Sequence, residues 1–177
     1  KTGKVLWKYN AQAAVIAPPI TYRAGGKQYV TVLTGMGTSA GAFADRVGAA
    51  IDYRTQARRV LTFAIDGTQT LPKAEPVVIT AAADPDFKPD AASAARGALV
   101  YGQHCVVCHG SEVISGGTGP DLRASAIPVS PDIFRQIVHG GAMVPSGMPQ
   151  FQEFTDQQLA DLRQYIRTEA SKLRNKR

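Results

Sequence analysis

Both cysteines of the chain lie in one short segment, residues 103–110, which reads QHCVVCHG. Two thiols separated by two residues suit three kinds of chemistry: a redox dithiol, part of a metal site, or the covalent attachment of a haem. A histidine, His109, directly follows the second thiol. The spacing alone allows all three, so the other candidate ligands and the surrounding elements must separate them.

Covalent haem attachment accounts best for Cys105, Cys108 and His109. A thioredoxin-like dithiol requires the pair between a strand and a helix of a βαβ unit, whereas here a helical pattern precedes it. A zinc site requires four ligands, which the cysteines and two of the three histidines, at 104, 109 and 139, would supply. However, His109 has little freedom to share a tetrahedral ion with Cys108. In haem attachment the two thiols add to the vinyl groups and the adjacent histidine binds the iron.

An electron-transfer haem needs a second axial ligand, and the chain has three methionines, Met36, Met143 and Met148. Met148 stands between Gly147 and Pro149, which predict an irregular loop able to present the thioether to the iron. A methionine is more often a filler of the core. Its place downstream of the attachment segment nevertheless favours Met148 as the ligand, and Met143 is expected to pack.

Residues near the two expected ligands are candidates for supporting roles. The carbonyl of Pro120 is suited to accept the Nδ1–H of His109, although Gly-Pro is also a common turn. Arg123 is a candidate partner of a haem propionate, with a solvated arginine as an equal alternative. His139 has the same ambiguity, and His104 is expected to be a helix-end residue.

Three helices are expected to position these residues. The first spans residues 91–104 and is capped by Asp90. The second follows Ser130, with Pro131 in its first turn and with Ile133, Phe134, Ile137 and Val138 on one face. The third begins at Thr155 with a capping-box pattern. Tyr165 and four apolar side chains of this helix are expected to face a core. The four are Leu159, Leu162, Ile166 and Leu173.

The first part of the chain has a different pattern. Residues 1–71 contain three expected strands, at 6–9, 27–34 and 59–65, separated by glycine-rich turns. This is too little sheet to stand alone, so the segment reads as part of a larger β-structure. A proline-rich linker over residues 72–90 follows, and residues 91–177 are helical. The expected fold class is therefore mixed.

Composition narrows the classes further. The chain has 177 residues, 44% of them hydrophobic and 19% charged, which suits a globular core. The formal net charge is +6, but the basic residues are dispersed except in the tail at 172–177, so nucleic-acid binding is not favoured. No apolar run is long enough to span a bilayer, and no signal peptide is recognisable.

Residues 91–177 resemble a class I cytochrome c domain. The likeness rests on the first helix, the CxxCH segment, the GPDL sequence at 119–122, the methionine loop and the final helix. In that family the first and last helices cross at a small residue and an aromatic one, for which Gly97 or Tyr101 and Tyr165 are suited. The resemblance implies a six-coordinate iron, held by His109 and Met148, that passes electrons.

Residues 1–7 carry a second resemblance, to the second half of the tryptophan-docking motif of eight-bladed quinoprotein dehydrogenase propellers, with Trp7 as its tryptophan. The runs at 17–22 and 26–30 are similar to the sequence that follows this motif in the last blades. The glycine-rich stretch at 35–41 occupies the place of a loop that reaches the pyrroloquinoline quinone (PQQ) pocket. The resemblance therefore implies three pocket contacts: Gly37, Thr38 and Ser39.

Together these segments resemble the C-terminal part of a type II quinohaemoprotein alcohol dehydrogenase. The resemblance implies haem c in this chain, and PQQ and calcium in the full-length enzyme. An alcohol would be oxidised in the missing part of the propeller, so no catalytic residue is expected here. Electrons would pass through the haem to a periplasmic acceptor: a copper protein, a cytochrome or a quinone-linked chain.

Two other functions compete with this interpretation. The chain could be a free-standing periplasmic c-type cytochrome that carries electrons without dehydrogenase activity of its own. It could also be a zinc-binding interaction module. The dehydrogenase and the free-standing cytochrome would both lie in the periplasm, because covalent haem attachment of this kind is completed there.

Overall fold

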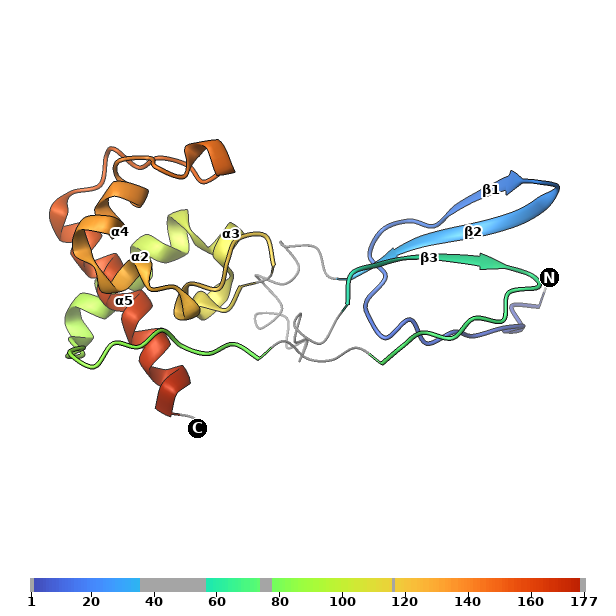
Figure 1. Ribbon diagram of the computed structural model, residues 1–177, viewed down its shortest axis with the longest axis horizontal. Helices are drawn as coiled ribbons and strands as arrows, with labels where there is room; N and C mark the ends of the chain where they lie inside the picture. Colours follow the sequence, from blue (N-terminus) through green and yellow to red (C-terminus); the bar gives the residue numbers. More distant parts are fainter. Residues whose placement is uncertain (1, 36–56, 74–77, 116, 176–177) are drawn as a thin grey trace. The chain divides into compact units, whose positions relative to one another are not determined.

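The computed structural model describes residues 2–35, 57–73, 78–115 and 117–175. These residues divide into two compact units, one ending at Val78 and the other starting at Ile79. The first contains a three-stranded antiparallel sheet and the second is helical, which gives the expected mixed fold (Figure 1). Met36 and the expected pocket contacts Gly37, Thr38 and Ser39 lie outside the described residues.

The sheet of the first unit is a simple meander. Strands β1 (Ile20–Ala24), β2 (Lys27–Thr34) and β3 (Arg59–Ala64) are neighbours in that order, with Tyr22 opposite Tyr29 and Val32 opposite Leu61. Gly25 and Gly26 join β1 to β2, and both have positive φ angles, 55° and 78°. Two-residue hairpin turns need this conformation, and glycine adopts it without a steric penalty.

The expected strands in this unit were only partly correct. β2 has the expected bounds and β3 ends one residue early, but residues 6–9 form no strand, and β1 was not predicted. The rings of Trp7 and Tyr9 instead pack against Phe63, at centroid distances of 5.2 and 5.0 Å. A strand exists only where a partner offers its hydrogen-bonding edge, and a local pattern does not identify that partner.

The helices of the second unit begin where their caps predict. They are α2 (Ala91–His104), α3 (Val106–His109), α4 (Pro131–Val138) and α5 (Asp156–Asn175). The carboxylate of Asp90 accepts from the first turn of α2, and the Ser130 hydroxyl accepts from the backbone N–H of Ile133. At α5, Thr155 and Gln158 exchange side-chain and backbone hydrogen bonds at 2.9 and 3.2 Å. The capping box is therefore formed.

Helices α2 and α5 cross at Gly97, as the cytochrome resemblance implied. A Cβ atom on Gly97 would lie 2.0 Å from the carbonyl oxygen of Asp161, so only glycine allows this approach. The Asp161 carboxylate, buried beside the crossing, accepts hydrogen bonds from Ser93, Arg96 and Gln157. One turn further along, the rings of Tyr101 and Tyr165 lie 5.3 Å apart. Packing and a charge network thus hold the two helices together.

The two crossing helices, α2 and α5, contribute to one hydrophobic core. Its buried members come from α2, α3, α4, α5 and the loops between them: Tyr101, Val106, Val113, Phe134, Val138, Phe154, Leu159, Leu162 and Ile166. Ile133, expected on the inner face of α4, is exposed, and Leu173 is only half-buried. The eight-residue α4 turns only a narrow stripe inward, which explains the exposure of Ile133.

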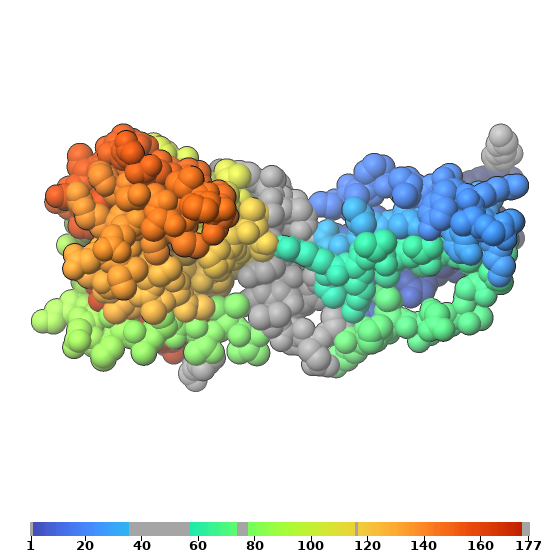
Figure 2. Space-filling view, turned by 45° about the horizontal axis from the view of Figure 1, so that its top comes forward, coloured from blue at the N-terminus to red at the C-terminus, as the bar shows by residue number. Residues whose placement is uncertain are grey.

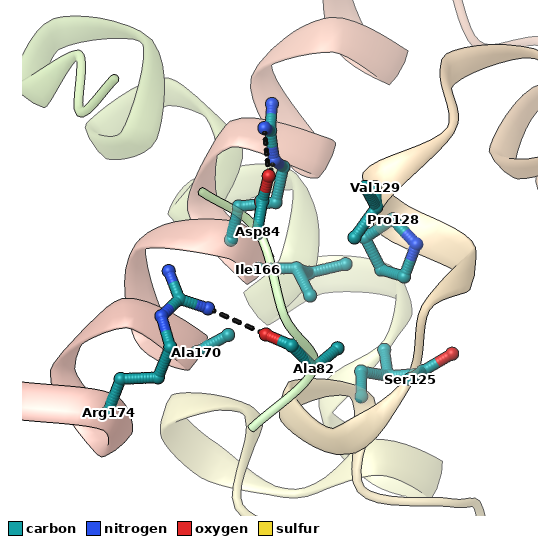
Figure 3. A pocket seen from close by; sticks show the side chains of 10 residues that line it. Ala82, Asp84, Ser125, Pro128, Val129, Ile166, Ala170 and Arg174 are labelled. Atoms are coloured by element: carbon teal, nitrogen blue, oxygen red, sulfur yellow. Dashed lines mark hydrogen bonds and ion pairs between the residues drawn. The ribbon is translucent and has the colours of Figure 1, made fainter. Parts of the chain in front are cut away.

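Part of the expected linker is bound to the helical unit. We call residues 79–90 the connecting segment; it runs along the surface of the helices (Figures 1 and 2). Asp84 receives two hydrogen bonds from Arg167 of α5, at 2.6 and 2.8 Å, and the Ala82 carbonyl accepts from Arg174 (Figure 3). The Ala82 N–H also donates to the Arg123 carbonyl, at 3.0 Å.

Candidate haem site

The attachment segment is a single turn of helix after the end of α2. The N–H of Cys105 closes α2 by donating to the Tyr101 carbonyl at 2.9 Å. The Cys105 carbonyl then accepts from both Cys108 and His109, at 3.2 and 2.9 Å. This turn brings the side chains of all three residues, Cys105, Cys108 and His109, to one cavity.

The cavity has a volume of about 310 Å³, the size of pockets that hold small organic ligands. Met148 lies in its wall together with the attachment residues, so the two expected axial ligands face one space. Most of the remaining wall is apolar: Leu122, Ile127, Phe134, Ile137, Val138, Leu162 and Ile166. No Asp, Glu, Lys or Arg side chain is among the described residues that line it. A flat, apolar macrocycle fits such a wall.

His109 is held in one orientation and in one tautomer. The residue is buried, with 8% of its surface exposed, and its Nδ1–H donates to the Pro120 carbonyl at 2.9 Å. Nε2 therefore carries the lone pair and is able to bind a metal. Gly119 packs against the ring, because a Cβ there would lie 2.8 Å from Cε1 of His109. The Gly119 N–H also donates to the Cys108 carbonyl, at 2.8 Å.

Met148 is presented by a tight loop. A short 3₁₀ turn, Val144–Ser146, ends at Gly147, whose φ of 88° is in the left-handed region that favours glycine. The N–H of Met148 then donates to the Met143 carbonyl at 3.2 Å. Met143, expected to be a packing residue, also lines the cavity, but 39% of its surface is exposed.

The cysteines are poorly suited to redox or zinc chemistry. Burial, with a smaller contribution from Cys108, raises the pKa of the Cys105 thiol to about 12. A reactive dithiol needs a lowered pKa, because the thiolate is the nucleophile. In the described part of the chain, no three His, Cys, Asp or Glu side chains gather as ligands of a metal ion. An apolar cavity lined by two thiols and an imidazole fits haem attachment instead.

The structure brings the other candidates to different partners. Arg123 is neither solvated nor part of the cavity wall; it is buried and forms two side-chain hydrogen bonds to Asp121, at 2.9 and 2.7 Å. His139 is outside the wall as well, and its carbonyl accepts from Gln150. His104 is the last residue of α2, as expected, yet it also lines the cavity.

Some residues of the site escaped sequence reasoning. Gly119 contacts the imidazole, and the GPDL sequence is its only signal. The prediction from that sequence concerns the carbonyl of Pro120 and not the glycine. The pairing of Asp121 with Arg123 is local in sequence, but nothing in the pattern shows that both side chains are buried. Phe151 lines the cavity three residues after Met148 and had no distinguishing signal.

Comparisons with known proteins agree with this geometry. Residues 92–166 match the family model described as cytochrome C oxidase, cbb3-type, subunit III. The chain is 36% identical over 169 residues to the dehydrogenase subunit of an alcohol dehydrogenase (quinone) from Gluconobacter oxydans. It is 37% identical over 166 residues to the quinohaemoprotein alcohol dehydrogenase ADH-IIG of Pseudomonas putida. Each match covers 93% of this chain, but only 22% and 23% of the relatives.

A solved structure of the Pseudomonas putida ADH-IIG enzyme is similar in fold, with a TM-score of 0.72 and 36% identity over 96% of this chain and 24% of that one. The helical unit is thus similar to a cytochrome family, and the chain as a whole is similar to part of the quinohaemoprotein alcohol dehydrogenases. The chain spans about a quarter of these relatives. No helix in the described ranges has both the length and the apolar character needed to cross a membrane.

Proposed function

We propose that this chain, which matches the cytochrome-bearing part of quinohaemoprotein alcohol dehydrogenases, carries the haem c that removes electrons from the PQQ of such an enzyme. One observation carries the proposal. Cys105, Cys108, His109 and Met148 line a single apolar cavity, although the last of them lies far along the chain from the other three. These residue types would attach haem c and supply two ligands to its iron.

Each residue has a defined part in this proposal. Bound haem would supply reversible one-electron reduction. Cys105 and Cys108 would hold it by thioether bonds to its two vinyl groups. His109 would bind the iron through Nε2, and the Pro120 carbonyl, which accepts from Nδ1–H, would make the imidazole a stronger ligand. Met148 would supply its thioether sulfur as a second ligand, which favours a high reduction potential.

The remainder of the enzyme would supply the oxidation itself. In this proposal residues 1–71 are the end of a PQQ- and calcium-binding propeller that oxidises an alcohol, and residues 91–177 are its electron-transfer domain. The final acceptor is a periplasmic redox partner. The relatives named alcohol dehydrogenase support the assignment through a match that includes the sheet as well as the helices. A free-standing electron carrier would not need the sheet.

The proposal is tested on the full-length protein produced in the bacterial periplasm with PQQ and calcium. An added alcohol is expected to give the absorption spectrum of reduced c-type haem within the turnover time. A C105A/C108A variant is expected to oxidise the alcohol with an artificial dye as acceptor, but to lack covalent haem. A wild-type protein without covalent haem, or with haem that an alcohol does not reduce, would contradict the proposal.

The axial ligand has a matched pair of variants in the chain. M148L is expected to lose the charge-transfer band between thioether sulfur and ferric iron. M143L is expected to keep it, although Met143 also lines the cavity. The opposite result would assign the ligand to Met143.

A further inference from the structure

His104 lies in the wall of the cavity that Cys105 and Met148 also line. It is the last residue of α2 and directly precedes Cys105, yet its side chain reaches the cavity wall. The residue is exposed, so core burial does not explain where the ring lies. Its side-chain contacts with the segment after Met148 account for the position of the ring instead.

The imidazole packs on the segment that follows the expected methionine ligand. Its ring meets Phe154 at a centroid distance of 5.0 Å and an angle of 78°, and Phe151 at 5.8 Å and 80°. The two phenylalanine rings are themselves stacked, 4.9 Å apart at an angle of 14°. Edge-to-face contacts are a favoured geometry of aromatic rings and stabilise the pair beyond burial of their area.

These contacts fix the chain that carries Met148. Phe151 is three residues after Met148, and its N–H donates to the Val138 carbonyl at the end of α4, at 2.9 Å. Phe154 is buried in the core immediately before α5. The methionine segment is thus held by α4 and by the core, and the His104 ring is its contact with the residue beside the haem-attachment cysteines.

We infer that His104 is a positioning residue for Met148, acting through its aromatic contacts with Phe151 and Phe154. The inference rests on the proposed ligation of haem iron by Met148. The His104 ring does not reach the iron in this role. It keeps the methionine segment closed over the cavity, so that the thioether stays at bonding distance and external ligands are kept out.

The experiment uses the haem-loaded protein in the ferric state, titrated with free imidazole, which competes with Met148 for the iron. H104A is expected to bind imidazole about tenfold more tightly, because losing the ring contacts, worth about 1.4 kcal/mol, raises the fraction with Met148 detached tenfold. H104F, which keeps the ring, is expected to remain within about twofold of wild type on the same grounds. Q103A, an exposed neighbour on the same helix, serves as the control.

The outcomes separate the inference from the function on which it rests. H104A with unchanged imidazole affinity, or H104F with an affinity raised as much as that of H104A, would overturn the positioning role while Met148 ligation stands. A wild-type protein that lacks the sulfur–iron charge-transfer band would refute Met148 ligation itself. A tenfold change in H104A with rescue in H104F, and no change in Q103A, establishes the role.

Discussion

The two units bury their apolar side chains to very different extents. Among the described residues, Leu61 is the sole buried apolar side chain of the sheet unit, whereas all the others belong to the helical unit. Several large apolar residues of the first unit are exposed, among them Leu6 at 89% of its surface. A three-stranded sheet with so little core is marginal by itself. The helical unit has the core that an independent domain needs.

The ion pairs of the two units differ in the same way. Lys27 and Asp66 in the sheet unit form a pair at 2.5 Å, with more than half of each side chain exposed. Arg167 and Asp84 in the helical unit form a pair at 2.6 Å that is largely buried. Exposed pairs are screened by water and contribute little, whereas breaking a buried pair leaves one charge without its partner. The comparison predicts that equivalent substitutions will have unequal effects.

The largest expected effect is at the helix crossing. G97A places a methyl group where 2.0 Å separates it from the Asp161 carbonyl, so α2 and α5 must move apart. We expect a loss of about 3 kcal/mol in the free energy of unfolding, measured by denaturant titration of the haem-loaded protein. G102A, in the same helix, meets no atom within 4 Å and is expected to gain about 0.5–1 kcal/mol. Equal effects of the two variants would show that the crossing is not tightly packed.

The two ion pairs give an intermediate effect. D84N is expected to destabilise the helical unit by about 2 kcal/mol, because the buried Arg167 guanidinium keeps its charge and loses the carboxylate. D66N is expected to leave the melting temperature within experimental error and to show no salt dependence beyond that of wild type. A D84N protein as stable as D66N would mean that the connecting segment adds nothing to the helical unit.

The smallest expected effect is the loss of folding stability at acid pH. Hydrogen bonds from Arg96, opposed by burial and aided by Ser93 and Gln157, hold the pKa of Asp161 at about 2 in the folded state. Because this pKa is lower than in the unfolded chain, the stability is complete above about pH 4. It is lost as the pH falls toward 2 and Asp161 becomes protonated.

Thermal melting followed by the helical circular dichroism signal between pH 6 and pH 2 measures this dependence. D161N is expected to be less stable at neutral pH and to lose less stability on acidification than wild type, since its side chain does not titrate. Parallel profiles of the two proteins would assign the acid sensitivity to other carboxylates, such as Asp84, whose pKa is also lowered by its hydrogen bonds from Arg167.

Helix boundaries were predicted far better than strands. Asp90, Ser130 and Thr155 each satisfy backbone N–H groups within three residues of themselves, so the signal is local and readable. The expected strand at 6–9 was wrong, and β1 was missed, because strand pairing depends on a partner elsewhere in the chain. The hairpin through Gly25 and Gly26 shows that the turn signal was present without its first strand being recognised.

The sequence by itself determined the candidate haem-site residues, Cys105, Cys108 and His109 in one turn and Met148 in its Gly-Pro loop, together with the starts of the three main helices. These features depend on residue type and short spacing, which the chain carries wherever it folds. Only the tertiary structure decided that Met148 meets the attachment residues in one cavity and that His104 touches Phe151 and Phe154. It likewise decided that Asp84 binds Arg167. Such contacts join residues far apart in the chain, so they depend on how the whole unit packs and pairs its charges.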